Sequence, residues 1–301
     1  QLFPWVPAWQ GTPQATTAMV KRVARYLGAD LVGIAPLNPL WFYSHAFWSN
    51  GAHKVISFRE AAEPVETESE LVIPSAMRWV IVLGKRMDQD MIALTPTPTG
   101  CAETGLAYSS MAQLSVTLAE FLRGLSYQAI PSLNDLALNI PMAIEAGFGE
   151  QGRHGKLITP EFGPSVRLCK VVTDLPLARD YPISFGVTRF CESCLRCAHQ
   201  CPSQSIPAGP RTWSGPNISN NPGVFTWHLN NETCRKYWNL ALGDNCTVCV
   251  RVCPFTKGPG LVHDVARAAV AGLPALHPLL VRLDDALGYG REKNTAAFWS
   301  A

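Results

Sequence analysis

Eight cysteines in two runs constrain this chain more than any other feature of its sequence. The first run has the spacing C-x2-C-x2-C-x3-C-P, and the second has C-x2-C-x3-C-P with one more cysteine upstream. The first spacing is that of bacterial ferredoxins with two clusters, in which the fourth thiolate of a run binds the other cluster. The pattern therefore predicts two [4Fe–4S] clusters: cluster A on Cys191, Cys194, Cys197 and Cys253, and cluster B on Cys201, Cys234, Cys246 and Cys249.

Structural zinc and disulfides are the alternatives for so many cysteines. Zinc sites favour paired C-x2-C knuckles rather than a triple that ends in Cys-Pro. Disulfide frameworks are typical of short secreted domains, whereas this chain has 301 residues. Two-residue gaps let a tight loop wrap three thiolates around one cube, and the proline ends the short helix that carries the last cysteine. The two other cysteines, Cys101 and Cys169, are expected to be small buried side chains.

The overall composition describes a compact chain with a sizeable core. Hydrophobic residues make up 47% of the chain and charged residues 16%. The formal net charge of +2 gives no electrostatic reason to expect a nucleic-acid partner. No apolar run approaches the ~18 residues that a membrane-spanning helix requires. The chain begins at Gln1 rather than methionine, which we interpret as a processed or trimmed form.

Patterns typical of helices and buried strands alternate before residue 186, without an internal repeat. They predict an α/β fold with a mixed sheet and an inserted ferredoxin-like module. No G-x-G-x-x-G opens a helix after a strand, so no dinucleotide site is predicted. We expect strands at 29–35, 79–83, 127–130, 156–159 and 165–174, helices at 16–27, 107–125, 140–146, 262–271 and 277–287, an exposed excursion at 49–75 and a loop at 94–105.

Motifs spread over much of the chain are similar to those of one protein family. They are LAYSSM, FLRGLSYQAIPS, AGFGEQGRHGKLITPEFGPSVRL, TDLPL, FGVTRFCESC, GPRTW, VCPFTKG and DDALGYG. Through them the chain resembles the corrinoid-dependent reductive dehalogenases, and among these the respiratory enzymes that act on chlorinated ethenes. The resemblance thins before residue 94, so it defines the walls of a substrate pocket least well.

The resemblance implies a fold and a set of cofactors. It implies a base-off cobalamin (corrinoid), bound without a histidine ligand from the protein, in an α/β domain related to cobalamin-processing and nitroreductase-like folds. Residues 1–185 are then the corrinoid-binding domain, 186–258 the iron–sulfur domain, and 259–301 a C-terminal segment that packs back on the corrinoid domain. The two [4Fe–4S] clusters are expected to deliver electrons to the cobalt.

The resemblance also assigns three catalytic residues: Tyr108 as the proton donor, Arg167 as the assisting cation and Asn134 as a hydrogen-bond donor to the halide or substrate. By sequence context alone, Tyr108 is an aromatic residue at a helix start and Asn134 a turn residue. By sequence context, Arg167 is an arginine within a strand of apolar residues, and it is expected to need a salt-bridge partner. A tyrosine hydroxyl is a weak acid at neutral pH, and a neighbouring cation favours the phenolate that remains after proton donation.

Aromatic side chains are concentrated in residues 1–48, where core packing and a shallow ring-lined pocket are both open interpretations. For Tyr26 we expect core packing. Trp41 and Trp48, together with Trp238 from the cysteine region, are the candidates for walls of the substrate pocket.

The function implied by the resemblance is that of a respiratory reductive dehalogenase, which replaces a carbon–halogen bond by carbon–hydrogen on small chlorinated aliphatics, in particular chloroethenes. The implied partners are the halogenated substrate, a small membrane-anchor protein, an electron donor from the quinone pool or a low-potential carrier, and a second copy in a homodimer. The implied location, after export, is the outer face of the cytoplasmic membrane.

Two other functions use similar cofactors. An epoxyqueuosine reductase also combines cobalamin with two clusters, but it acts on tRNA and is expected to have an acidic proton donor and a basic RNA surface. A non-catalytic electron or corrinoid carrier has no need of the Tyr–Asn–Arg set. A corrinoid-free protein with intact clusters would favour the carrier.

Overall fold

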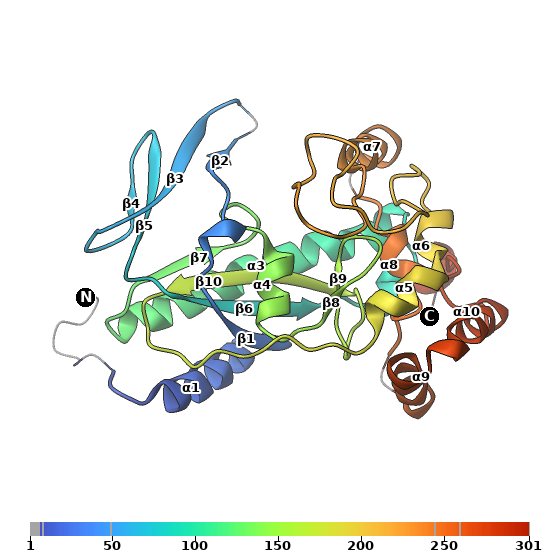
Figure 1. Cartoon of the computed structure of the whole chain (residues 1–301), viewed down its shortest axis with the longest axis horizontal. Coiled ribbons are helices and arrows are strands. Elements are labelled where there is room, and N and C mark those ends of the chain that lie inside the picture. The colour runs from blue at the N-terminus through green and yellow to red at the C-terminus, as the bar shows by residue number, and fades with distance from the viewer. Residues whose placement is uncertain (1–6, 8, 49, 244, 259, 301) are drawn as a thin grey trace. The chain divides into compact units, whose positions relative to one another are not determined.

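The computed structural model describes residues 7, 9–48, 50–243, 245–258 and 260–300 (Figure 1). Contacts divide the chain into two compact units whose segments alternate along the sequence. The first unit comprises Gln1–Lys85, Tyr108–Phe148 and Arg167–Pro182, and the second comprises Arg86–Ala107, Gly149–Val166 and Ile183–Ala301. The division into domains at 1–185, 186–258 and 259–301 stays a prediction. The expected α/β class with a mixed sheet is confirmed, as the sheets below show.

A four-stranded sheet forms the centre of the first unit. Its strand order is β1 (Leu31–Pro36), β6 (Trp79–Arg86), β10 (Val166–Thr173) and β7 (Ala129–Ser132). β1 is antiparallel to β6, and β7 is antiparallel to β10. Residues 80–83 of β6 are fully buried, because the sheet is covered on both faces. The strands at 29–35, 79–83, 127–130 and 165–174 were therefore predicted correctly within a few residues.

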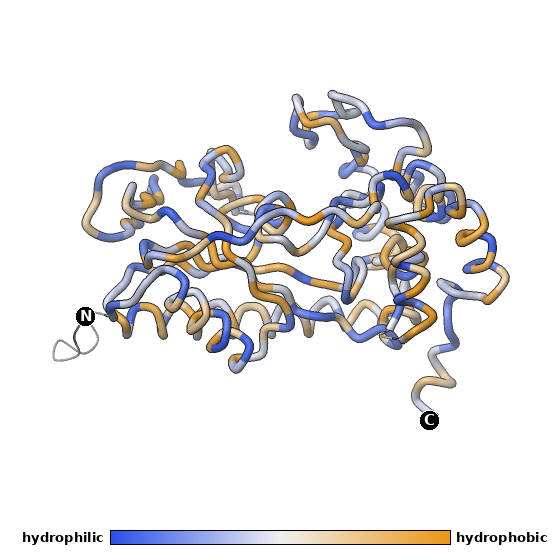
Figure 2. Tube along the Cα trace, turned by 60° about the horizontal axis from the view of Figure 1, so that its bottom comes forward, coloured by the Kyte–Doolittle hydropathy of each residue, from blue (hydrophilic) through white to orange (hydrophobic). Residues whose placement is uncertain are grey.

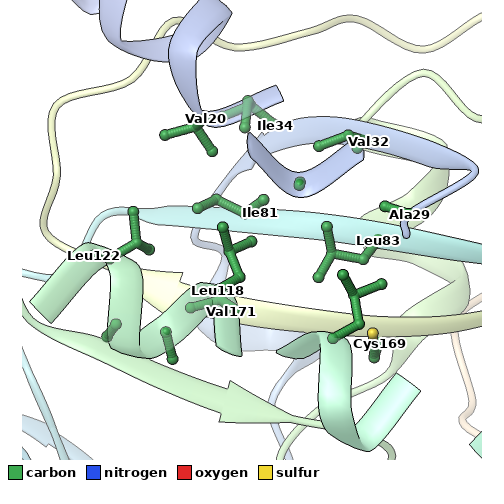
Figure 3. Close-up of a cluster of buried hydrophobic side chains, with 14 of the residues drawn as sticks. Val20, Ala29, Val32, Ile34, Ile81, Leu83, Leu118, Leu122, Cys169 and Val171 are labelled. Atoms are coloured by element: carbon green, nitrogen blue, oxygen red, sulfur yellow. The ribbon is translucent and has the colours of Figure 1, made fainter. Parts of the chain in front are cut away.

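Three helices belong to this layer: α1 (Pro13–Tyr26), α3 (Pro98–Gly124) and α4 (Asn139–Glu145). Val20 of α1, Ile34 of β1, Ile81 of β6 and Leu118 of α3 are fully buried and lie in one cluster (Figure 3). Burying each such side chain is worth about 1.5–3 kcal/mol. Figure 2 shows the corresponding orange segments along the central strands. Tyr26 is not part of this core; it is 89% exposed at the end of α1, contrary to expectation.

A second sheet occupies the segment that the sequence predicted to be an exposed excursion. Its order is β2 (His45–Phe47), β3 (His53–Arg59), β5 (Glu70–Pro74) and β4 (Val65–Glu66). β3 and β5 are parallel, while the two outer pairs are antiparallel. Ile56, Val72 and Ile73 are buried, so the segment is not exposed throughout. The acidic stretch at 63–70 concealed this strand pattern.

Two further boundaries differ from the predictions. The expected loop at 94–105 is wrong in its second half, because α3 begins at Pro98, where a proline is tolerated since the first amides of a helix lack partners. The Thr97 hydroxyl accepts a hydrogen bond from the Gly100 amide there. The expected pairing of 156–159 with 165–174 is also wrong, since β9 (Leu157–Ile158) pairs with β8 (Glu150–Gln151).

Short helices and long loops build the second unit. Gly186 precedes α5 with a φ of 89°, a conformation that favours glycine. A cluster of buried apolar residues, including Phe190 of α5 and Phe255, packs between these helices. The helices are α2 (Gln89–Ile92), α5 (Val187–Cys194), α6 (Arg196–His199), α7 (Asn231–Tyr237), α8 (Val248–Arg251), α9 (Leu261–Gly272), α10 (His277–Ala286) and α11 (Thr295–Trp299), with short turns η1 (Pro39–Trp41, in the first unit), η2 (Trp238–Leu242) and η3 (Pro274–Leu276).

A buried ionic cluster holds α10 in the second unit. Asp284 of α10 is ion-paired with both Arg196 of α6 and Lys257, and all three are at least 90% buried in their side chains. Arg196 also pairs with the half-exposed Asp285 at 3.0 Å. Within the described residues no single helix is long and apolar enough to cross a membrane; the bent pair Leu261–Gly272 and Pro274–Ala286, at 118°, passes that test only when taken together.

Candidate active site and cysteine centres

The three residues assigned by resemblance to catalysis lie together in the first unit. Tyr108 is half-buried on α3, and its ring packs against the core. The side-chain amide of Asn134, from the loop after β7, donates a hydrogen bond to the Tyr108 hydroxyl at 2.6 Å. The Arg167 guanidinium, from β10, lies over the Tyr108 ring at 5.8 Å from its centroid. Their catalytic roles stay predictions.

This arrangement has a plain chemical consequence for the tyrosine. The hydroxyl oxygen has an N–H donor beside it, and the guanidinium of Arg167 lies over the ring. The hydroxyl accepts from Asn134, so its own proton remains available to another acceptor. The site therefore places an O–H donor, an amide N–H and a cation next to one another.

Two residues behind the tyrosine, Lys170 and Asn139, were not found from the sequence. Lys170 of β10 is fully buried, and its Nζ donates to Leu133 O at 2.8 Å, Ala137 O at 3.2 Å and Asn139 Oδ1 at 2.8 Å. Burial lowers the pKa of Lys170 to about 8. The signal in the sequence was a lysine flanked by apolar residues in the strand VRLCKVVT, whose ammonium must find partners in the protein.

The cysteines assigned to cluster A surround one cavity in the second unit. Its lining includes all four of them, together with Arg153, His154 and Phe190. Burial raises the pKa of Cys191 to about 12, so a thiolate there requires a bound positive charge. Within the described ranges no three His, Cys, Asp or Glu side chains converge to hold one metal ion, and the four cysteines line this cavity together.

The cysteines assigned to cluster B also lie near one another. The pKa of Cys246 is raised to about 11, mainly by burial and further by the neighbouring Cys249, Cys234 and Cys201. The Cys201 sulfur accepts a hydrogen bond from the Ser205 amide at 3.4 Å. Cys234, which lies outside the compact C-x2-C-x3-C run, is therefore placed beside that run by the fold.

His154 provides a test of whether the cluster A cavity fits an iron–sulfur cube. His154 is 2% exposed, and its Nδ1 accepts a hydrogen bond from the Lys156 amide at 3.2 Å. Burial lowers the pKa of His154 to about 3, so the ring is neutral and Nε2 carries the proton. This Nε2 has no hydrogen-bond partner among the described residues, although His154 lines the cavity. A cluster sulfur is an acceptor that suits such a donor.

Arg153, next to it, adds fixed positive charge. Its guanidinium donates to the carbonyl oxygens of Cys191 at 3.0 Å, Pro207 at 2.7 Å and Gly209 at 2.8 Å. The residue is 2% exposed and stacks over Trp227 at 4.6 Å. A buried cation beside four thiols offsets the negative charge that an iron–sulfur cluster brings.

The cysteines outside both sets behave as expected. Cys169 is fully buried in the core of the first unit, and burial raises the pKa of its thiol to about 12. Cys101 is also buried, and its thiol donates to Asn245 O at 2.7 Å.

The three tryptophans proposed for a substrate pocket have different neighbours. Trp41 donates from Nε1 to Glu145 Oε1 at 3.0 Å. Trp48 lines a cavity of the first unit with Phe47 and Leu136. Trp238 donates from Nε1 to the sulfur of Cys234 at 3.1 Å, so its nearest polar neighbour is a predicted cluster ligand. The substrate pocket stays a prediction.

Comparison with known proteins relates the chain to one group of sequences. A family model described as a reductive dehalogenase subunit matches residues 61–177. The tetrachloroethene reductive dehalogenase of Sulfurospirillum multivorans is 43% identical over 298 residues, which cover 95% of this chain and 59% of that protein. The enzyme of the same name from Dehalobacter restrictus is 37% identical, with 93% and 55% covered. The chain thus spans little more than half the length of these curated relatives.

Solved structures share the fold. The structure of a reductive dehalogenase described as B12-dependent superposes with a TM-score of 0.77 at 24% identity, covering 95% of this chain and 39% of that one. An epoxyqueuosine reductase bound to a tRNA stem loop superposes with a TM-score of 0.51 at 16% identity, covering 85% and 70%. At these identities the likeness concerns the fold.

Proposed function

We propose that this chain, which is related by sequence to the reductive dehalogenases over 95% of its length, performs corrinoid-dependent reductive dehalogenation of small chlorinated aliphatics, in particular chloroethenes. The observation that carries the proposal is the position of the Tyr108 hydroxyl, which accepts a hydrogen bond from Asn134 at 2.6 Å while Arg167 lies over its ring. The names of the curated relatives supply the substrate class.

The reaction replaces a carbon–chlorine bond by carbon–hydrogen with two electrons and one proton, and it releases chloride. Tyr108 gives the proton from its hydroxyl. The Asn134 amide and the Arg167 cation then stabilise the phenolate oxygen until it is protonated again from solvent. These side chains supply a proton and positive charge but no electrons, so the chemistry of the site fits a separate reducing cofactor. A bound corrinoid would supply the two electrons at the carbon–halogen bond.

We further propose that the eight cysteines hold two [4Fe–4S] clusters in a ferredoxin-like module. The spacing of the two runs, the cavity enclosed by the cluster A thiols and the unpartnered Nε2 of His154 support this assignment. Arg153 contributes a buried cation beside cluster A. Clusters held by these cysteines would supply one-electron carriers between an external donor and the site of reduction.

The partners and the location are proposed from the family resemblance alone. They are an electron donor from the quinone pool or a low-potential carrier, a small membrane-anchor protein and a second copy of the chain. The proposed location is the outer face of the cytoplasmic membrane, where such an anchor would hold the protein.

Epoxyqueuosine reduction is the second candidate, because an epoxyqueuosine reductase shares 30% identity over 124 residues, which is 40% of this chain. A tRNA substrate calls for a basic surface, whereas the net charge here is +2. The residue with the geometry of a proton donor is a tyrosine rather than a carboxylic acid. Both observations favour the dehalogenase.

The test is halide release from a panel of chloroethenes, with reduced viologen as electron donor and protein that contains both corrinoid and clusters. We expect chloride and the less chlorinated ethene in equal amounts. A tRNA stem loop with epoxyqueuosine, offered under the same conditions, is the matched control and should remain unchanged. Reduction of the tRNA without chloride release would replace this proposal by the alternative.

A further inference from the structure

A chain of hydrogen bonds connects the buried Lys170 with the Tyr108 hydroxyl. Lys170 Nζ donates to Asn139 Oδ1 at 2.8 Å, and Asn139 Nδ2 donates to Asn134 Oδ1 at 2.7 Å. Asn134 Nδ2 in turn donates to Tyr108 Oη at 2.6 Å. The chain thus passes from a fully buried ammonium, through two amides, to a half-buried phenol.

The direction of every bond in this chain follows from its buried end. An ammonium has three N–H donors and no acceptor, and Lys170 uses them on three oxygens. The Asn139 atom that faces Lys170 must therefore be oxygen, which turns its NH2 group toward Leu133 O at 2.9 Å, Leu168 O at 3.2 Å and Asn134. Carbonyl oxygens only accept, so they hold Asn139 in the same orientation.

The same reasoning continues to the tyrosine. The two N–H groups of Asn139 are shared among three oxygens, and its nitrogen cannot accept. The facing atom of Asn134 must therefore be its oxygen, and its nitrogen faces Tyr108. The Tyr108 hydroxyl then has to accept this bond and cannot donate into it. Its proton is directed away from the protein network.

We infer that Lys170 and Asn139 are positioning residues for Tyr108: together they fix the polarity of the Asn134 amide, so that the tyrosine hydroxyl accepts from the protein and donates its proton to the substrate. This inference rests on the proposed function for the identity of the substrate, but the polarity itself does not depend on it. Burial lowers the pKa of Lys170 only to about 8, so the ammonium keeps its three donors at neutral pH. Two neutral side-chain amides without a charged neighbour can each rotate by 180° and exchange their O and N positions. The amides of Asn139 and Asn134 cannot rotate in this way without losing the charge-assisted hydrogen bond from Lys170.

The substitution Asn139→Asp reverses the polarity with almost no change in shape. A carboxylate still accepts from Lys170 but cannot donate to Asn134. Because Asn134 is exposed, its side chain can rotate so that its NH2 group donates to the new carboxylate. The Asn134 oxygen then faces Tyr108 and accepts the proton of the tyrosine hydroxyl. Asn134→Asp at the exposed end reverses the last bond directly, and it serves if the first variant does not fold. Asn38→Asp is the matched control, because Asn38 uses only its oxygen, as acceptor from the Leu40 amide.

The experiment uses the protein with its cofactors, labelled with 13C at the ring Cζ of tyrosine and kept in its oxidised state. The Tyr108 signal is the one that disappears in Tyr108→Phe. We expect Asn139→Asp and Asn134→Asp to move this signal, and Asn38→Asp to leave it in place. In chloroethene reduction, kcat of the first two variants should fall by about 10²–10⁴-fold with little change in KM, as for loss of a positioned general acid.

The possible outcomes separate the inference from the proposed function. An unmoved Tyr108 signal in both variants overturns the inference, whatever happens to turnover, and so does a moved signal with wild-type kcat. If the wild-type protein reduces no chloroethene but the signal moves as expected, the proposed substrate is wrong and the polarity of the chain is confirmed.

Discussion

The tyrosine site and the cluster A cavity differ in the hydrogen-bond partners of their buried polar groups. Behind Tyr108, the polar groups of Lys170 and Asn139 are joined to one another and to backbone oxygens. Around the cluster A cysteines, His154 has a buried N–H donor without a partner among the described residues, and burial raises the pKa values of the thiols.

The difference indicates what each site requires from outside the chain. The tyrosine site is assembled by the protein alone, since each link of its chain has a donor and an acceptor of the right kind. At the cysteine site, His154 has a buried donor without an acceptor among the described residues, and such a donor costs about 1–3 kcal/mol, so a bound acceptor beside the thiols would stabilise the site. We therefore expect the first site to be formed with or without iron, and the second to depend on it.

The largest effect is expected from Cys234→Ala. Removing this ligand should abolish electron delivery through cluster B and lower iron and acid-labile sulfide by about half, while the electron paramagnetic resonance signal of cluster A remains. Cys169→Ala is the control, because it removes a thiol that lies in the apolar core. Full iron content in Cys234→Ala would show that Cys234 is not a ligand. The Tyr108 Cζ signal should be unchanged in either variant if the tyrosine site forms without the cluster.

The next effect is on stability and concerns the ionic cluster of the second unit. Asp284→Asn leaves Arg196 and Lys257 buried without their common partner, which should lower the free energy of unfolding by about 3–5 kcal/mol. Asp285→Asn removes the half-exposed partner of the same arginine and should cost less than about 1 kcal/mol. The midpoints of anaerobic urea unfolding, followed by circular dichroism, measure both. Equal midpoints for the two variants would mean that Asp284 is not the anchor of α10.

The smallest effect concerns His154. Replacing it by leucine removes the N–H donor that we assign to a cluster sulfur, so the reduced cluster loses a hydrogen bond. A bond worth about 0.5–1.5 kcal/mol corresponds to a fall in the one-electron potential of roughly 20–65 mV. Redox titration followed by electron paramagnetic resonance measures it, with the exposed His45→Leu as control. An unchanged potential for cluster A would place His154 outside hydrogen-bonding reach of the cluster.

The sequence predicted the parts of both sites that depend on spacing or on family motifs. The cysteine spacing led to two sets of four, and the structure gathers the same sets. The motifs led to Tyr108, Asn134 and Arg167, which the fold brings together from α3, a loop and β10. The central strands were recognisable because their residues are apolar on both faces.

The residues that orient the site could not be predicted in the same way. Lys170 contacts the oxygens of residues 133, 137 and 139, more than thirty positions away, so its partners emerge only when β7 and β10 pair. The unpartnered nitrogen of His154 likewise depends on a three-dimensional environment. Trp238 was predicted as a pocket wall from its aromatic character, and only the fold shows its indole N–H at the Cys234 sulfur.

Tyr108→Phe tests the central claim most directly, because it keeps the ring in the core and removes only the hydroxyl. The measurement is chloride release per corrinoid from a chloroethene, at matched iron and corrinoid content. The account predicts a rate about 10²–10⁴-fold below that of the wild-type protein. A variant that retains near wild-type turnover with full cofactor content would contradict it, and the proton would then come from water or from another side chain.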